Sequence, residues 1–314
     1  MAQQPPHPDN PDVTVKRFTT TTLCVGITLA LAPSALATFP GKNAMIAFVH
    51  TERGGLPEVY TMRPDGSHER HLANGQVPAF SPSGRKVLFA KRGTNDLYTI
   101  RANGTRRHRI PHTSRSIVGS FAPSGKKIVF SRARRNYIDS DLYKIRIDGS
   151  HRKRLPHARY GDDPQFSPNG RWIVFHKGGG LCHICLIRPD GTDQRSLTAH
   201  SGEPVDDSSP DFSPDGRKIA FTRETDPGDG RRKWGIYTIR KDGTHLKRVY
   251  EATNEIIDDP VFSPDGRNIA FSRREFFWTY SRIYTIRPDG SHLKRLSHGP
   301  GGHEQLSWGR SSVG

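Results

Sequence analysis

The chain has little of what metal sites, hydrolase nucleophiles and membrane spans are built from. Only three of its 314 residues are cysteine, so a second ligand pair for a cysteine-based zinc site is missing. The sequence contains neither a Gly-x-Ser-x-Gly nor a His-Glu-x-x-His motif. Its apolar residues make up 33%, and none of its apolar runs approaches the roughly 20 residues of a transmembrane helix. These absences argue against a membrane-spanning protein and against the common hydrolase sites.

The N-terminus has the three parts of an export signal. The basic pair Lys16-Arg17 precedes an apolar run at 23–31, and Ala35-Leu36-Ala37 has the small-x-small pattern of a cleavage site. We predict cleavage after Ala37. The folded protein is then expected outside the cytoplasm, either secreted or retained in the periplasm or cell wall.

Cleavage at this point divides the chain into a signal peptide, residues 1–37, and a mature domain, residues 38–314. It removes two basic and two acidic residues, so the formal net charge of +17 belongs to the mature domain. Cys24 leaves with the signal, and Cys182 and Cys185 remain as a Cys-x-x-Cys pair. In an exported protein this pair is expected to form a local disulfide or to stay as two half-buried thiols.

A Phe-x-Pro-x-Gly segment recurs five times along the chain. Its prolines are 41 to 50 residues apart, at Pro82, Pro123, Pro168, Pro214 and Pro264. Each segment is followed by a β-rich run such as KIAFT, a second run such as GIYTIR, a glycine turn and a basic run such as GSHLKRL. Proline presets the backbone of a tight turn and glycine accepts its left-handed position, so four short strands are expected in each unit. Four-stranded repeats of this length predict β-propeller blades.

Six blades are expected, because one unit is split between the two ends of the mature chain. The run at 45–49 begins a unit that lacks its own Phe-x-Pro-x-Gly strand, and residues 304–309 match that strand. The predicted fold class is therefore all-β, a six-bladed β-propeller of four-stranded blades in which the C-terminal strand completes the first blade. Such closure removes the exposed strand edges that an open array would leave.

These units resemble the propeller repeats of the TolB-like family, a WD40-like repeat. The resemblance rests on FSPDGRKIAF at 212–221, FSPDGRNIAF at 262–271 and IYTIR at 236–240 and 283–287, and it extends over nearly all of the mature chain. It implies a propeller fold, and it says less about function because repeats of this kind occur in proteins with several functions. TolB itself carries an N-terminal α/β domain and links partners in the cell envelope. Here the propeller is expected to begin within a few residues of the cleavage site, which favours a TolB-like propeller rather than TolB.

Acidic residues gather at one mouth of the predicted channel. In such a blade the Phe-x-Pro-x-Gly strand is innermost, so the residues just before each phenylalanine are expected to line the mouth. The predicted ligand-binding residues are Asp162, Asp163, Asp206, Asp207, Asp258, Asp259, His303 and Glu304. Clustered carboxylates repel one another until a cation arrives, so this mouth is predicted to receive a cationic peptide group, an amine or a divalent ion. The alternative is that these aspartates accept hydrogen bonds from backbone N–H groups at the strand entry.

The excess of basic residues indicates a second kind of partner. Pairs such as Lys153-Arg154, Lys247-Arg248 and Lys294-Arg295 lie in the predicted outer strands. Their field attracts anionic polymers, including nucleic acid, teichoic acid or acidic polysaccharide, with low specificity. A solvated basic surface without a partner is the alternative. Base-stacking aromatics are not interleaved with these residues, so a specific nucleic-acid site is not expected.

Two functions are compatible with these patterns. The first is a monomeric, non-enzymatic module, without cofactor or catalytic residues, that binds a protein or peptide at the mouth and anionic polymers on its basic surface. The second is a metal-assisted propeller hydrolase or polysaccharide lyase. Histidines do recur after the outer strands, but four strands at about 4.8 Å spacing hold them too far from the axis to converge on one ion. They are His112, His157, His200 and His298.

Overall fold

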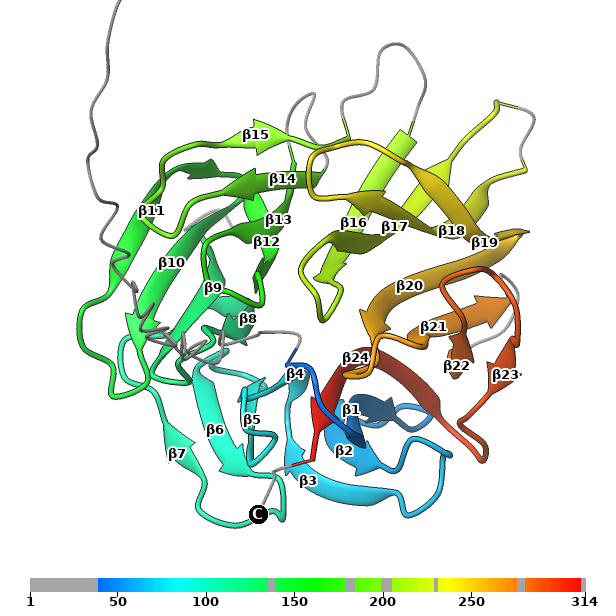
Figure 1. Ribbon diagram of the computed structural model, residues 1–314. Coiled ribbons are helices and arrows are strands. Elements are labelled where there is room, and N and C mark those ends of the chain that lie inside the picture. The colour runs from blue at the N-terminus through cyan, green and yellow to red at the C-terminus, as the bar shows by residue number, and fades with distance from the viewer. Residues whose placement is uncertain are drawn as a thin grey trace, which may run out of the picture. The chain divides into compact units, whose positions relative to one another are not determined.

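The computed structural model describes residues 39–134, 139–178, 184–198, 205–228, 231–275 and 280–311, without the side chain of Val118. Within them the regular elements are β-strands, grouped into six four-stranded sheets. The sheets stand around a common centre as the blades of a propeller (Figure 1). Among the described residues, none belongs to a helix long and apolar enough to cross a membrane. The signal peptide falls outside the described residues, so the boundary at residue 37 stays a prediction.

Each blade consists of four antiparallel strands that succeed one another from the centre outward. The innermost strands are β24 (Gly302–Arg310), β4 (Gln76–Phe80), β8 (Ser116–Phe121), β12 (Gly161–Phe166), β16 (Val205–Phe212) and β20 (Glu255–Phe262). The second strands are β1 (Asn43–Thr51), β5 (Lys86–Ala90), β9 (Lys127–Ala133), β13 (Ile173–Lys177), β17 (Lys218–Thr225) and β21 (Ile269–Glu275). The third strands are β2 (Glu58–Met62), β6 (Leu97–Arg101), β10 (Ser140–Arg146), β14 (Ile184–Ile187), β18 (Lys233–Arg240) and β22 (Arg282–Ile286). The outer strands are β3 (Arg70–Asn74), β7 (His108–Arg109), β11 (Lys153–Arg159), β15 (Arg195–Ser196), β19 (Lys247–Thr253) and β23 (Lys294–Arg295).

The turn between the first two strands of a blade shows why the repeat sequence folds this way. In the fifth blade the Ser213 hydroxyl donates to Asp215 Oδ1 at 2.6 Å and accepts from the Lys218 amide at 2.9 Å. The Arg217 amide donates to the same Asp215 oxygen at 3.0 Å. Gly216 has a φ of 65°, in the left-handed region that glycine enters without strain. The Ser-Pro-Asp-Gly segment thus satisfies its own backbone and fixes the hairpin.

The hydrophobic core lies in the seams between blades. In every blade the second strand contributes a phenylalanine that is at most 1% exposed, namely Phe48, Phe89, Phe130, Phe175, Phe221 and Phe271. Each seam has its own apolar cluster; Phe271, for example, packs with Ile236 and Val249 of the preceding blade. Full burial of one such side chain contributes about 2 to 3 kcal/mol, so each blade is held in place mainly by its neighbours.

The ring closes through the two ends of the described chain, as the sequence predicts. Strand β24 pairs with β1, and Ile46 lies opposite Trp308 while His50 lies opposite His303. Figure 1 shows the red β24 beside the blue β1. The six-bladed architecture and its closure by the C-terminal strand are therefore confirmed.

Candidate functional site

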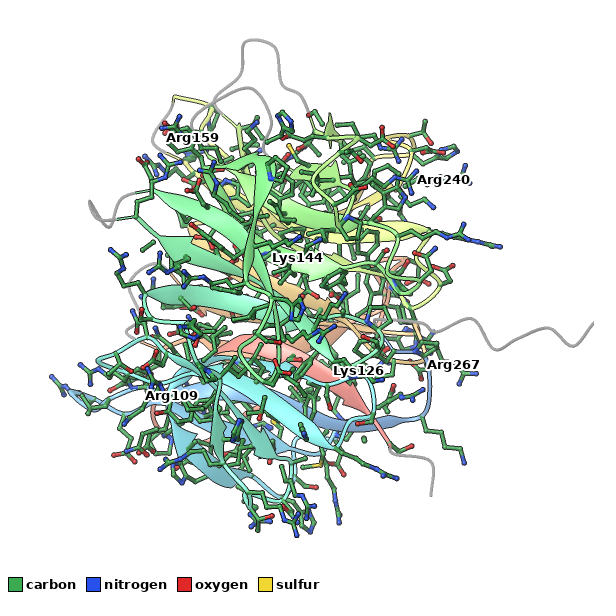
Figure 2. The ribbon with its side chains drawn as sticks, turned by 90° about the vertical axis from the view of Figure 1, so that its left-hand side faces the viewer. Arg109, Lys126, Lys144, Arg159, Arg240 and Arg267 are labelled. Atoms are coloured by element: carbon green, nitrogen blue, oxygen red, sulfur yellow. The ribbon has the colours of Figure 1, made fainter. Side chains whose placement is uncertain are left out.

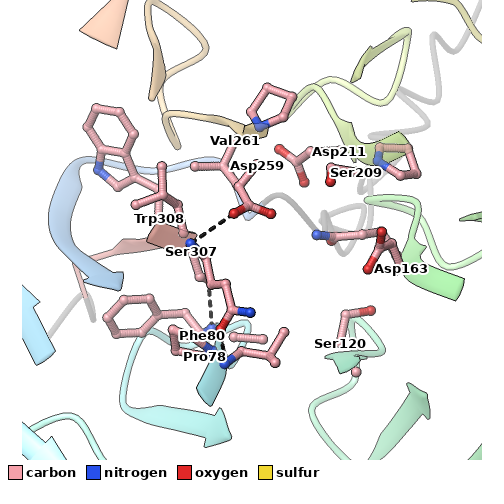
Figure 3. A pocket seen from close by; sticks show the side chains of 18 of the residues that line it. Pro78, Phe80, Ser120, Asp163, Ser209, Asp211, Asp259, Val261, Ser307 and Trp308 are labelled. Carbon is pink, nitrogen blue, oxygen red and sulfur yellow. Dashed lines mark hydrogen bonds between the residues drawn. The ribbon is translucent and has the colours of Figure 1, made fainter. Parts of the chain in front are cut away.

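A pocket lies at the centre of the ring, where the inner strands approach their turns. All six inner strands line it, and its cavity volume is about 110 Å³. Figure 3 shows Ser120, Asp163, Ser209 and Asp259 around it. A cavity needs roughly 10 to 15 Å³ by this measure to hold one water, so this pocket has room for the polar end of a single side chain.

Each inner strand has a β-bulge, and in five of these strands a residue of the bulge lines this pocket. In the sixth blade the strand register slips between Asp258 and Val261, and it slips at the corresponding place in the other five blades. A left-handed φ of 48° to 54° occurs three residues before the final aromatic residue of the strand, at Val77, Asp163, Ser209, Asp259 and Gln305. Aspartate tolerates this conformation, whereas for a β-branched valine it is a strained outlier that persists only where the surroundings hold it.

The side chains at these bulges connect neighbouring blades. The backbone N–H of Gln305 donates to Asp259 Oδ2 at 2.9 Å, and the backbone N–H of Val77 donates to the side-chain oxygen Oε1 of Gln305 at 3.0 Å. The Ser209 backbone N–H donates in the same way to the Asp163 carboxylate. A bulge takes an N–H group out of the strand ladder, and leaving it unpaired is costly. The side chain of one blade therefore satisfies the backbone of the next.

Asp163 and Asp259 hold carboxyl groups whose ionisation is disfavoured. Burial raises the pKa of Asp163 well above its usual range, and repulsion from Asp162 and Asp258 adds to this. Burial likewise raises the pKa of Asp259 well above its usual range, reinforced by Asp258 and Asp163. Both residues keep part of their surface at the pocket. Among the ion pairs of the described chain, none involves either carboxylate.

Asp162 and Asp258, the first members of their pairs, brace the backbone. Asp162 Oδ1 accepts from the Asp163 amide at 2.9 Å, and Asp258 Oδ1 accepts from the Asp259 amide at 2.8 Å. Asp258 Oδ1 also accepts from the Ser209 hydroxyl at 2.8 Å. The alternative expected from the sequence, that these aspartates satisfy local N–H groups, therefore describes the first member of each pair. The second member faces the pocket.

Asp206 and Asp207 do not belong to the pocket, which corrects the expectation for the fifth blade. Asp207 is fully buried in an ion pair with Arg223, at 2.7 Å from Nε to Oδ1 and 2.9 Å from Nη2 to Oδ2. Asp206 is exposed near His176. The cause is spacing, because Asp207 precedes its phenylalanine by five residues whereas Asp163 and Asp259 precede theirs by three. Ser209 takes the pocket position instead.

His303 and Glu304 are also outside the pocket lining. His303 is fully buried and its ring packs against Phe48 and His50, at centroid distances of 5.1 and 4.9 Å. Glu304 is exposed, and the next residue, Gln305, lines the pocket. Counting three residues back from the aromatic residue of each inner strand identifies both Gln305 and Ser209 from the sequence.

Ser120 is a pocket residue that no sequence signal singled out. It is 7% exposed, and within the described chain its hydroxyl has no hydrogen-bond partner. A buried hydroxyl is normally paired, so an unpaired one in a pocket lining points to a ligand group or water as partner.

The remaining predicted features concern cysteines and metals. Cys185, on β14, is fully buried and disulfide-bonded. Cys182 lies outside the described residues, so its pairing with Cys185 stays a prediction. Over the described ranges, the structure contains no group of three or more His, Cys, Asp or Glu side chains placed to hold a metal ion.

The chain matches the family model of the TolB beta propeller domain, PD40, over residues 8–208. It belongs to this family. Its fold is similar to that of TolB from Acinetobacter baumannii, with 18% identity and a TM-score of 0.73 over 88% of this chain and 69% of that one. A search of curated proteins finds no match.

Two further solved structures share the fold. One is an oligogalacturonate lyase in complex with manganese, with 12% identity and a TM-score of 0.59 over 84% of this chain and 77% of that one. The other is a chain of a nidogen/laminin complex, with 10% identity and a TM-score of 0.65 over 85% of this chain and 100% of that one. At such low identities the similarity shows the propeller fold alone, and the function has to be argued from the residues of the site.

Proposed function

We propose that this TolB-like propeller is a monomeric, non-enzymatic interaction module that binds a cationic group of a peptide or protein in its central pocket. The observation that carries the proposal is the pair Asp163 and Asp259, whose carboxyl groups line the pocket without an ion-pair partner among the described residues. The unpaired hydroxyl of Ser120 lines the same pocket.

The electrostatics of the pocket favour a cation over a neutral ligand. Burial and repulsion from neighbouring carboxylates disfavour the ionised form of both carboxyl groups, and an ammonium or guanidinium group bound beside them reverses that penalty. Hydrogen bonds from such a group to a carboxylate are about twice as strong as neutral ones. A lysine or arginine side chain, or the amino terminus of a peptide, supplies this chemistry.

Titration calorimetry with short peptides that carry one lysine or arginine tests the proposal. Because the pKa values of both acids are raised, cation binding is expected to release protons at any pH at which the empty pocket still holds them, and the observed enthalpy then changes with the ionisation heat of the buffer. The double variant Asp163→Asn/Asp259→Asn is expected to lose this proton release and to bind at least about tenfold more weakly. Asp242→Asn, which changes an exposed aspartate, is the matched control and is expected to bind as the unaltered protein does.

Two results would count against the proposal. Equal affinity of the double variant and the control for the peptides would remove Asp163 and Asp259 from the site. Saturable Mn²⁺ binding together with metal-dependent cleavage of an oligosaccharide or ester would favour the hydrolase or lyase function instead.

Export is part of the same proposal. The basic pair, the apolar run and the small-x-small pattern support cleavage after Ala37 and a location outside the cytoplasm. N-terminal sequencing of the protein recovered from its producing cells or medium is expected to begin at Thr38. An uncleaved N-terminus in a cytoplasmic fraction would contradict export.

Binding of anionic polymers is a second candidate function, and the distribution of arginines favours it. In every blade an arginine lies at the end of the third strand, namely Arg63, Arg101, Arg146, Arg188, Arg240 and Arg287. The adjoining turns, together with the Phe-x-Pro-x-Gly turns, form one face of the propeller, which we call the turn face. Figure 2 shows Arg240 and Arg267 at this edge, and Arg109 and Arg159 at the opposite one. The same turns also carry aspartates, such as Asp65, Asp190 and Asp242, but the formal net charge of the chain is +17, and an excess of positive charge attracts polyanions.

A further inference from the structure

A second pocket lies on the turn face, at the seam between the fifth and sixth blades. It is lined by four exposed cationic residues, which are Lys218, Lys247, Arg267 and Arg287, together with Asn268, Pro288 and Asp289. Lys218 and Lys247 begin β17 and β19, whereas Arg267 and Arg287 lie in or beside turns of the next blade. The repeat therefore brings cations from two blades to one place.

Two corresponding seams contain other side chains at these positions. Between the third and fourth blades, Lys144 spans the seam and donates to the Pro189 carbonyl. The residue equivalent to Lys144 in the fifth blade is the short Thr238. In the fourth blade, Trp172 occupies the position of Lys218 and stacks on arginines of its own blade, with its ring centroid 4.1 Å from Arg188 Cζ and 4.6 Å from Arg195 Cζ. The fifth blade has a threonine and a lysine at these two positions, and the pocket lies at its seam with the sixth blade.

The pocket has an excess of positive charge. Hydrogen bonds from Ser291 lower the pKa of its one carboxylate, Asp289, and the charges of Arg287 and Lys247 act in the same direction, so Asp289 offsets one of the four positive charges. Its carboxylate, Asp289, accepts from the Ser291 amide at 2.8 Å and from the Ser291 hydroxyl at 2.7 Å. Lys247 Nζ is 3.4 Å from the Asp289 carbonyl oxygen. None of the four cationic side chains takes part in an ion pair of the described chain. Four like charges around one hollow repel one another, and a multivalent anion relieves that repulsion.

We propose that this pocket binds a phosphate group of a linear polyanion and anchors the polymer on the turn face. The proposal rests on the polyanion-binding function above and assigns it a site and a ligand chemistry. Along a linear polyphosphate each internal phosphate carries one negative charge and a terminal phosphate up to two, with several acceptor oxygens on each. Neighbouring phosphates of one polymer can therefore be contacted by the two lysines and two arginines together, which a single carboxylate cannot match. The rest of the polymer is then expected to run across the turn face and contact the arginines at the ends of the other third strands.

Binding of inorganic polyphosphate at several salt concentrations tests the site. Lys218→Gln/Arg287→Gln is expected to lower the affinity roughly tenfold and to reduce the slope of log affinity against log salt by about 2, because two phosphate contacts are lost. Arg92→Gln/Arg159→Gln makes the same charge change at the opposite face, where both residues are exposed. That control is expected to alter the affinity by about twofold or less, as a change in the long-range field alone.

Thr238→Lys distinguishes phosphate binding in the pocket from attraction of the polyanion by the net positive charge of the protein. The new side chain is expected to span the seam as Lys144 does and donate to the Pro288 carbonyl, so it fills the pocket while adding a positive charge. Weaker polyphosphate binding supports the site; stronger binding overturns it, because net charge then governs affinity. An unfolding measurement on each variant shows whether the fold is intact.

The remaining outcomes distinguish the site from the function. If Arg92→Gln/Arg159→Gln lowers the affinity for polyphosphate as much as Lys218→Gln/Arg287→Gln does, the pocket is not the binding site, although the protein still binds polyanions. If the unaltered protein does not bind polyphosphate, both the phosphate site and the polyanion-binding function are wrong. Tighter, pocket-dependent binding of polygalacturonate overturns the phosphate assignment in favour of a carboxylate polymer.

Discussion

His50 and His303 face each other across the joint that closes the ring, with their ring centroids 4.9 Å apart. Within the described chain, Nδ1 of His50 and both ring nitrogens of His303 are buried without a hydrogen-bond partner. Burial lowers the pKa of His303 to about 3, and the neighbouring His50, Arg282 and Arg295 act in the same direction. The strand that completes the ring therefore carries an imidazole that must stay neutral.

Acid is expected to weaken the closed ring through His303. In the unfolded chain a histidine gains its proton near pH 6.5, whereas His303 in the folded protein has a pKa of about 3. The free energy of unfolding is therefore unaffected by His303 above the unfolded-state pKa, and it falls as the pH drops below that pKa. Between pH 7 and pH 5 the free energy of unfolding is expected to fall by about 2 kcal/mol because of this group. His303→Leu, which keeps the volume, is expected to remove that part of the pH dependence in urea unfolding. His108→Leu, at an exposed histidine, is the control, and an unchanged pH dependence in His303→Leu would refute the assignment.

The two pocket aspartates are expected to lower stability at neutral pH in the absence of a ligand. Their folded-state pKa values are raised, so the unfolded chain ionises first as the pH rises above about 4, and stability falls over that range. Asp163→Asn and Asp259→Asn are expected to raise the unfolding midpoint at pH 7 and to match the unaltered protein near pH 3. Asparagine tolerates the left-handed φ and its amide oxygen can still accept the N–H of the next blade. A lower midpoint at pH 7 would show that the carboxylates stabilise the empty pocket.

Removing one partner of the buried pair Asp207 and Arg223 is expected to be severe. Asp207→Ala leaves a guanidinium that is 10% exposed without its carboxylate and costs about 3 to 5 kcal/mol of unfolding free energy. Asp206→Ala, one residue away on the exposed side, is expected to change stability by about 0.5 kcal/mol or less and to leave peptide binding unaltered. Loss of peptide binding in Asp206→Ala would restore that residue to the site.

Gly309 is expected to tolerate no side chain at the closing joint. A Cβ there would lie 2.7 Å from the ring of Phe80, a buried side chain on the neighbouring inner strand. Gly309→Ala is expected to cost about 1 to 3 kcal/mol in thermal or urea unfolding, because a rigid ring must move. In Gly178→Ala the new atom lies 3.8 Å from its nearest neighbour, the Tyr160 carbonyl oxygen, which is an ordinary contact, so this control is expected to stay near the unaltered stability. Similar stability of both variants would show that Phe80 can shift.

Sequence alone determined the architecture of this protein. In each Phe-x-Pro-x-Gly turn the residue before the glycine accepts a backbone N–H two residues on; it is Asp215 or Asp265 in two turns and Ser83, Ser124 or Asn169 in the others. The hairpins are therefore encoded locally, and their repetition indicates the blades. The match of residues 304–309 to the missing first strand was enough to predict closure. These features are local or periodic, and a single chain displays them directly.

Only the tertiary structure decided which side chains meet in the pockets. Successive strand residues point to opposite faces, and the extra residue of each bulge changes the face to which the neighbouring side chains point. For this reason Gln305 rather than Glu304 lines the pocket. The contacts that define the sites also join distant positions, such as Val77 with Gln305, which are 228 residues apart. The pocket beside Lys218 likewise joins residues of two blades, Lys218 and Lys247 from the fifth and Arg267 and Arg287 from the sixth. Such contacts follow from how the blades pack, and a pattern within one blade cannot specify them.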